Sequence, residues 1–135
     1  MSFENFGRIN YITETKVADF VEHLQGGEIT ATRCKKCGSL YFPPRADCTD
    51  CLSSDVEYIP LSGKGKVITF TTAHFAPVGF EAPYTLVLAE LEEGLRVFTR
   101  LSDEVEKGEI RIGMKVKLFP KKLDDERVTY ELKKA

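Results

Sequence analysis

The chain has 135 residues, of which 42% are hydrophobic and 10% aromatic, enough for the core of one ordinary domain or two very small ones. This composition excludes a wholly disordered chain, and a net charge of -2 excludes a polybasic protein that acts mainly by neutralising phosphates. No apolar run approaches the roughly 18 residues of a membrane span, and the N-terminus lacks a signal-peptide pattern, so we expect a soluble, cytoplasmic protein.

An amphipathic helix is predicted ahead of the cysteines. Its apolar residues recur at the spacing of one helix face: Val17, Phe20, Val21 and Leu24. Gly26 and Gly27 end this pattern, and His23 falls on the opposite side, so we expect His23 at the surface. Further apolar residues upstream either pack on the protein's own core or dock on a partner, and both options stay open: Phe3, Phe6, Ile9, Tyr11 and Ile12.

Four cysteines form two C-x-x-C pairs: Cys34, Cys37, Cys48 and Cys51. Two such pairs on short loops supply four thiolates to one tetrahedral metal ion. Structural disulfides belong to oxidising compartments, and a thioredoxin-type redox site needs one pair in a βαβ context. We therefore predict a closed, structural zinc site without a catalytic role, although iron suits the same four sulfurs.

Five strands are predicted after the cysteines, where the apolar pattern changes to a period of two. They cover residues 66–72, 84–91, 95–101, 115–119 and 127–133, with a hairpin turn at 92–94. This pattern is typical of a small Greek-key barrel, with the OB fold as the leading candidate and an SH3-like barrel as the alternative. The predicted fold is therefore mostly β, with a helical arm (1–27), a zinc ribbon (28–60) and a five-stranded OB-fold barrel (61–135).

Several segments, taken together, resemble one known family. They are R-C-K-K-C-G (33–38), F-P-P-R-A-D-C-T-D-C (42–51), L-S-G-K-G-K-V (61–67), A-P-Y-T-L-V-L-A-E-L-E-E-G (82–94) and I-G-M-K-V (112–116). Over residues 15–135 the chain resembles the OB-fold, acyl-CoA-associated proteins with an N-terminal rubredoxin-like zinc ribbon, a family long filed as a domain of unknown function. The resemblance assigns the metal ligands to the four cysteines.

The resemblance also implies an accessory role in acyl-CoA metabolism. Similar archaeal proteins are non-catalytic scaffolds that join acetoacetyl-CoA thiolase to hydroxymethylglutaryl-CoA (HMG-CoA) synthase in the mevalonate pathway and help to enclose the CoA pantetheine arm. Other relatives accompany thiolase-like enzymes of lipid or steroid breakdown, or of polyketide assembly. We therefore expect a non-enzymatic subunit whose partners are a thiolase and HMG-CoA synthase.

The residues themselves supply no catalytic set, because the metal site takes all four cysteines and only His23 and His74 remain as histidines. Contact with acyl-CoA needs an apolar wall with a few polar groups. The candidates are His74, Phe75, Tyr84 and Arg100, with Phe80 and Pro83 as further wall residues and Lys64, Lys66 and Arg96 as further groups for phosphates.

Two other functions stay open. OB barrels and zinc ribbons often bind single-stranded nucleic acid, but residues 61–122 carry only ten basic against eight acidic residues, without a basic stripe of interleaved aromatics. An iron-containing electron-transfer module has the right ligands. Its cysteine pairs, however, are spaced more closely here than in rubredoxins, and the barrel has no role in it.

Overall fold

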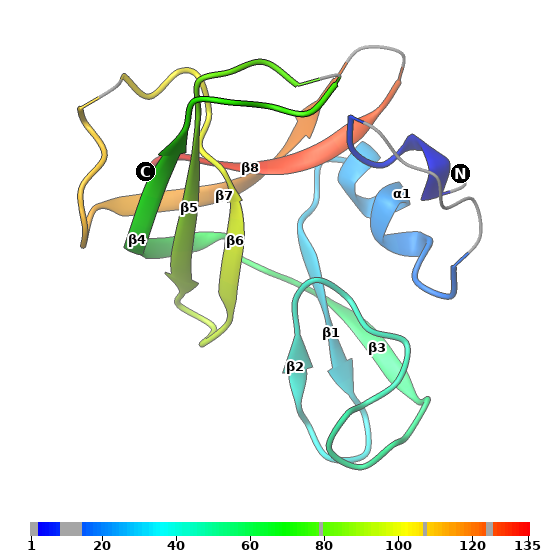
Figure 1. Ribbon diagram of the computed structural model, residues 1–135. Helices are drawn as coiled ribbons and strands as arrows, with labels where there is room; N and C mark the ends of the chain where they lie inside the picture. Colours follow the sequence, from blue (N-terminus) through cyan, green and yellow to red (C-terminus); the bar gives the residue numbers. More distant parts are fainter. Residues whose placement is uncertain (1–2, 9–14, 79, 107, 124–125) are drawn as a thin grey trace.

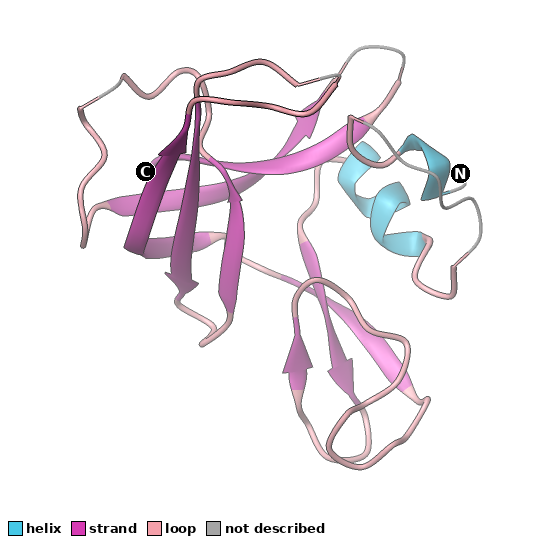
Figure 2. Cartoon of the chain, viewed as in Figure 1, coloured by secondary structure: helices cyan, strands magenta, loops and turns pink. Residues whose placement is uncertain are grey.

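The computed structural model describes residues 3–8, 15–78, 80–106, 108–123 and 126–135. The ribbon diagrams show a barrel with a smaller sheet projecting from it (Figure 1, Figure 2). The smaller sheet has three strands. The elements in chain order are η1 (Phe3–Asn5), α1 (Asp19–Gln25), β1 (Thr30–Cys34), β2 (Leu40–Tyr41), β3 (Val56–Pro60), β4 (Lys64–Ala73), β5 (Tyr84–Leu91), β6 (Arg96–Arg100), β7 (Lys115–Lys122) and β8 (Val128–Lys134). Within the described residues, no helix has the length and apolar character to cross a membrane.

All five predicted strands form, as β4 to β8, and they make a nearly closed barrel. The sheet order is β6-β5-β4-β7-β8, and neighbouring strands are antiparallel. The two edges meet where Leu101, just after β6, forms a parallel bridge with Leu132 of β8. There the Ser102 N–H donates to the Leu132 carbonyl at 2.7 Å. Closure leaves little unpaired strand edge, which is how a small barrel avoids edge-to-edge aggregation.

The barrel interior is filled by alternate residues of its strands. On β5, Val87, Ala89 and Leu91 are buried, while the residues between them are more exposed. The other buried apolar side chains of the barrel strands are Val67, Val97, Val116, Leu118, Val128 and Leu132. This period of two is the pattern from which the strands were predicted.

The backbone passes very close to neighbouring barrel strands at two glycines, one just before β4 and one within it. A Cβ atom added to Gly63 would lie 2.5 Å from the Leu118 carbonyl oxygen, and one added to Gly65 would lie 2.5 Å from the Glu90 carbonyl oxygen. The glycines of the segment L-S-G-K-G-K-V are thus required by backbone packing. The two lysines of that segment have no such explanation.

An aromatic cluster joins the four parts of the molecule. Phe20 of α1 lies 6.1 Å from Phe6 of the arm, 5.8 Å from Phe42 of the ribbon and 6.0 Å from Tyr130 of β8, measured between ring centroids. Phe6 also forms a parallel bridge with Val128. The described part of the arm therefore packs on the protein's own core, while Ile9, Tyr11 and Ile12 lie outside the described residues.

The helix α1 confirms three of the four residues of the predicted apolar face, whereas Val17 lies before the first helical residue, Asp19. Phe20, Val21 and Leu24 are buried. His23 Nδ1 lies 3.0 Å from Thr30 Oγ1, and its ring meets the Tyr58 ring edge-on at a centroid distance of 5.0 Å. His23, expected at the surface, is therefore half-buried, because the ribbon sheet packs against that side of the helix. The predicted boundaries between arm, ribbon and barrel, after residues 27 and 60, stay a prediction, because the three parts share one core.

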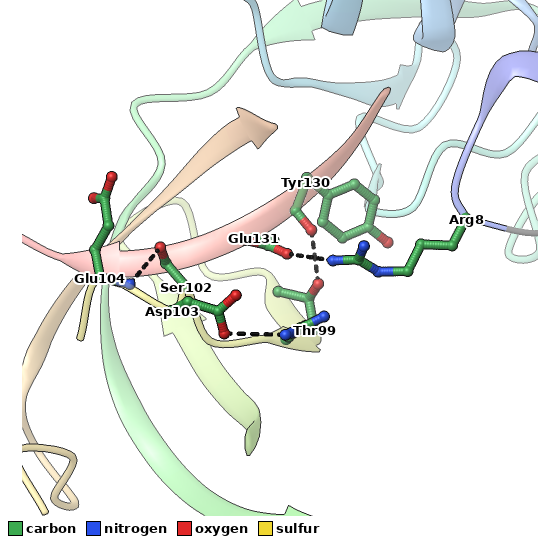
Figure 3. Close-up of polar contacts among 8 residues, drawn as sticks. Arg8, Thr99, Ser102, Asp103, Glu104, Tyr130 and Glu131 are labelled. Atoms are coloured by element: carbon green, nitrogen blue, oxygen red, sulfur yellow. Dashed lines mark hydrogen bonds and ion pairs between the residues drawn. The ribbon is translucent and has the colours of Figure 1, made fainter. Parts of the chain in front are cut away.

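A buried carboxylate lies where the arm meets β8 (Figure 3). Glu131 is 4% exposed, and its Oε2 atom lies 3.4 Å from Arg8 Nη2. Burial raises the pKa of Glu131, and the positive charges of Arg100, Lys121 and Arg8 offset this only in part. Beside it, Thr99 Oγ1 donates to the Tyr130 carbonyl at 2.9 Å, which helps to hold β6 against β8.

We expect Glu131→Gln to change the pH dependence of stability. The raised pKa means that the folded state holds this proton more tightly than the unfolded chain. The contribution of Glu131 to the unfolding free energy is therefore fully present at low pH, where the side chain is protonated in both states. It falls as the pH rises and the folded protein loses this proton. Relative to the Gln variant, the wild type should lose stability as the pH rises above the ordinary glutamate pKa of about 4, measured by urea unfolding. Glu104→Gln, at an exposed position, is the control, and parallel curves for wild type and Glu131→Gln would contradict the prediction.

Candidate functional site

The four cysteines lie in two turns at one end of the sheet β2-β1-β3. Cys34 ends β1 and Cys37 lies in the turn before β2, whereas Cys48 and Cys51 lie in the loop between β2 and β3. Both turns have the same hydrogen bonds. Gly38 N–H donates to the Cys34 carbonyl at 2.9 Å, and Leu52 N–H donates to the Cys48 carbonyl at 3.0 Å. The residue after each pair has a positive φ, which is 82° at Gly38 and 61° at Leu52.

This arrangement brings all four sulfurs together. Their Sγ atoms lie within 4.8 Å of one another, with Cys34 to Cys51 at 3.5 Å and Cys37 to Cys48 at 3.4 Å. A tetrahedral ion with metal–sulfur bonds of about 2.3 Å needs sulfurs about 3.8 Å apart. The donor set and its spacing thus fit one four-coordinate metal ion, with no open position for a substrate.

The pKa values of Cys48 and Cys51 are shifted in opposite directions. The Tyr41 hydroxyl, 3.3 Å from Cys48 Sγ, is the main cause that lowers the pKa of Cys48 to about 6. The Ser53 backbone lowers the pKa of Cys51, but the Cys34 sulfur, burial and the other sulfurs raise it to about 12. Adjacent thiolates repel each other, so a cation between them is what allows all four to be deprotonated together.

Tyr41 ties the second cysteine pair to β2. Its hydroxyl accepts the Thr49 N–H at 3.1 Å and also contacts Thr49 Oγ1 at 2.9 Å. We expect Tyr41→Phe to weaken metal retention about 10- to 100-fold, measured by competition with a chelator, because groups that hydrogen-bond to metal ligands orient them. Tyr58→Phe is the matched control, since Tyr58 lies in the same sheet with its ring against His23 and contacts no sulfur among the described residues. Equal metal loss from both variants would contradict a specific role of Tyr41.

The four residues predicted to contact acyl-CoA lie at one end of the barrel. The guanidinium carbon of Arg100 is 5.9 Å from the centroid of the Tyr84 ring. Tyr84 pairs with Ala73, the residue before His74. His74 and Phe75 begin the loop between β4 and β5, where Phe75 is 91% exposed. The structure brings Tyr84 and Arg100 into contact, and no described contact joins them to His74 or Phe75.

Two exposed apolar residues of this end were not predicted. Val78, in the same loop, is 90% exposed, and Phe98 of β6 is 59% exposed. The register pairs Phe98 with Leu88 and Arg100 with Leu86, so these side chains share one side of the sheet. We call this surface the outer β5–β6 face: Tyr84, Leu86, Leu88, Phe98 and Arg100. Strand alternation alone would have placed Phe98 outside, because its neighbour Val97 is buried.

Comparisons with known proteins agree with this architecture. Residues 22–57 match the rubredoxin-like zinc ribbon domain of ChsH2, and residues 58–119 match the C-terminal OB-fold domain of ChsH2. The predicted ribbon and OB-fold barrel are thereby confirmed, and the SH3-like alternative is excluded.

Two relatives match most of the chain. It is 40% identical over 112 residues to a DUF35 domain-containing scaffold protein of Methanocaldococcus jannaschii, covering 78% of this chain and 79% of that protein. It is 35% identical over 105 residues to the benzoylsuccinyl-CoA thiolase subunit BbsA of Geobacter metallireducens, covering 76% of this chain and 71% of that protein.

A solved structure shows the same arrangement. A chain of the Ltp2-ChsH2(DUF35) aldolase superposes with a TM-score of 0.78 at 30% identity, covering 93% of this chain and 98% of that chain. The likeness therefore extends over the arm, the ribbon and the barrel together.

Proposed function

The chain belongs to the DUF35 family of proteins with a rubredoxin-like ribbon and an OB-fold domain, and on this premise we propose that it is a non-catalytic accessory subunit of an acyl-CoA-processing enzyme. The observation that carries the proposal is the 40% identity to a scaffold protein over 79% of that protein's length. A relative that is a thiolase subunit and one found in an aldolase assembly support the same class of partner.

The chemistry of the chain supports a role without catalysis. A thiolase-type reaction needs a free thiol activated by a base. All four cysteines lie in the ribbon cluster, so using one of them as a nucleophile would dismantle the metal site. His23 is engaged with Thr30. His74 is exposed and has no hydrogen-bond partner among the described residues, so neither histidine is placed as a base beside a free thiol.

We propose zinc as the metal and a structural role for it. Four thiolates and a closed tetrahedral site are the usual donor set of structural zinc. The ribbon sheet is small, and β2 has only two residues, so the metal supplies much of the energy that holds the two cysteine turns together. Iron would bind the same four sulfurs, and metal analysis of protein purified without added metal distinguishes the two ions.

For contact with acyl-CoA we propose the loop after β4 and the outer β5–β6 face. In OB folds, ligands bind to the face of the second and third strands and to the loop between the first two, and these correspond here to β5, β6 and residues 74–83. The rings of Phe75 and Tyr84 supply apolar surface for a pantetheine arm. His74 and Arg100 supply polar groups beside it. We expect these four residues to complete a channel whose other wall belongs to the partner enzyme.

As partners we propose acetoacetyl-CoA thiolase and HMG-CoA synthase, acting together in the cytoplasm on the mevalonate pathway. The naming of relatives as a scaffold protein and as a thiolase subunit supports a thiolase partner. A scaffold that holds two such enzymes draws acetoacetyl-CoA into the second reaction, which helps because its formation is unfavourable.

The test is a pull-down of the tagged protein from its own cells at moderate salt, followed by mass spectrometry and activity assays. We expect recovery of a thiolase, with or without the synthase, and no thiolase or synthase activity from the protein alone. Turnover that survives rigorous purification would overturn the non-catalytic assignment. Recovery of nucleic acid that is lost at higher salt would favour the single-stranded nucleic-acid alternative.

A further inference from the structure

The second half of the first barrel strand has a neighbouring strand on one side only. Strand β4 pairs with β5 as far as Ala73, but its pairing with β7 ends at Lys66. The last bonds on the β7 side are those of the Val67 N–H and carbonyl, at 2.9 Å and 2.8 Å. A β-bulge then shifts the strand. We call residues 69–73, which follow the bulge, the open edge of β4.

The register shows which backbone groups of the open edge are unpaired. In an antiparallel pair, successive residues direct their N–H and C=O groups alternately toward one neighbour and away from it. The Thr85 carbonyl accepts the Leu101 N–H at 2.8 Å, so Thr85 bonds on the side away from β4. Its partner Thr72 therefore directs its own N–H and C=O away from β5, and so does Phe70, two residues earlier. Among the described residues, neither has a backbone hydrogen bond on that side.

The open edge also lacks the usual protection of an edge strand. Natural edge strands carry charged residues or proline, which prevent pairing with another chain. The sequence from Val67 to Ala73 is V-I-T-F-T-T-A, which contains neither and consists mostly of strand-favouring residues. Residues 69–72 are all exposed. Elsewhere β6 and β8 close the barrel by bridging to each other. Unpaired N–H and C=O groups along an uncharged edge are the chemistry that recognises another extended backbone.

We propose that an extended segment of the partner enzyme pairs with the open edge as an additional strand. The inference rests on the proposed accessory function. The N–H and C=O groups of Phe70 and Thr72 form the backbone hydrogen bonds with this segment. On one face the segment lies beside Thr71, which pairs with Leu86, so the added strand extends the outer β5–β6 face. On the other face it meets the Phe70 ring, which is 37% exposed, so an uncharged side chain fits there.

A second copy of this chain suits the open edge less well. With a strand length of about 17 Å and a sheet thickness of about 10 Å, edge-to-edge pairing covers roughly 170 Å² of each chain. A stable interface covers about 800 Å² per partner. Two sheets joined edge to edge lie side by side, which leaves both outer β5–β6 faces uncovered. A partner enzyme that also covers this face and the loop after β4, where Phe98 and Phe75 are exposed, adds the missing area.

The first test is residue-resolved amide hydrogen exchange of the metal-loaded protein alone and of the complex recovered by the pull-down described above. In the protein alone, the amides of Phe70 and Thr72 should exchange fast, whereas those of Thr69 and Thr71 exchange slowly because they bond to β5. In the complex, the amides of Phe70 and Thr72 should slow by about tenfold or more.

Each other outcome of this test overturns the inference in a distinguishable way. Unchanged fast exchange of Phe70 and Thr72 in the complex would overturn it and leave the accessory function intact. Recovery of no enzyme would overturn both. The reverse pattern in the protein alone, with Thr71 fast and Thr72 slow, would show that the unpaired groups face β5. Protection of Phe70 and Thr72 that appears in the protein alone as its concentration rises would assign the edge to a second copy.

Proline variants provide a second test, because proline removes a single backbone N–H. Thr72→Pro removes an N–H on the open edge, so the barrel keeps its bonds, while affinity for the recovered enzyme should fall about tenfold or more. Thr71→Pro removes an N–H that bonds to β5 and should destabilise the barrel itself. The matched control is Thr72→Val, which loses the contact with Thr85 Oγ1 at 3.2 Å but keeps the N–H, and it should bind as the wild type does.

Thermal melting of each variant reports whether the barrel is folded. Wild-type affinity of a folded Thr72→Pro variant, or an equal loss of affinity in Thr72→Val, would contradict strand addition at this edge. A Thr72→Pro variant as destabilised as Thr71→Pro would contradict the direction assigned to the Thr72 N–H.

Discussion

Replacing Cys34 or Cys51 by serine is expected to release the metal, unfold the ribbon and abolish binding to the partner enzyme. Both sulfurs belong to the single cluster, 3.5 Å from each other. Structural zinc contributes about 10–16 kcal/mol to the folding of such a segment, more than its small apolar core can replace. Because Phe42 connects the ribbon to Phe20 and Tyr130, we expect the disorder to reach the contact with the helix as well.

Metal content per chain, nuclear magnetic resonance of the ribbon backbone and recovery of the partner enzyme measure this effect. Lys36→Gln is the matched control, since Lys36 lies between the cysteines of the first pair, is exposed and forms no ion pair among the described residues. The control should keep its metal and its partner. If either serine variant keeps full metal content and assembles normally, the four-thiolate site is wrong.

Gly63→Ala is expected to destabilise the barrel by roughly 2–5 kcal/mol, as the sum of two separate costs. The first is conformational, because Gly63 has a φ of 79°, which disfavours any residue with a Cβ atom. The second is steric, because the new Cβ would lie 2.5 Å from the Leu118 carbonyl oxygen. That oxygen belongs to a barrel strand and cannot move without disturbing β7.

Two other glycines separate the two costs. Gly94 has a φ of 86° but no atom within 4 Å of an added Cβ, so Gly94→Ala tests the conformational cost alone. Gly65 has no positive φ but an added Cβ would meet the Glu90 carbonyl oxygen at 2.5 Å, so Gly65→Ala tests the steric cost alone. Urea unfolding of the three variants should rank Gly63→Ala as the most destabilised. A loss at Gly63 no larger than at Gly94 would show that the barrel relaxes around the methyl group.

Much of the fold was predictable because its signals are local. The alternation of apolar and polar residues marks β4 to β8, since each strand buries one face in the barrel. The spacing of the two C-x-x-C pairs likewise indicates one shared metal site, because each pair lies within a single turn. The short ribbon strands were not predicted, since β1, β2 and β3 have mixed or partial burial and no long alternating pattern.

The features that were missed depend on contacts between distant segments. His23 lies against Thr30 and Tyr58 because the ribbon folds back onto α1, which helix periodicity does not reveal. The lysine pairs Lys64–Lys117 and Lys66–Lys115 between β4 and β7 were not predicted, for the same reason. Counting ten basic against eight acidic residues treats the barrel as one average charge, whereas the register of β4, β7 and β8 places like charges opposite one another.

The sequence by itself therefore determined the helix, the five barrel strands, the grouping of the four thiolates and the family, all of which follow from residues close together in the chain. Only the tertiary structure decided that arm, helix, ribbon and barrel meet at Phe20, and that Tyr84 and Arg100 share one outer face. The physical reason is that strand register and helix packing result from burying apolar surface over the whole chain. This packing leaves polar groups on the surface, and no single segment of the sequence predicts where they lie relative to one another.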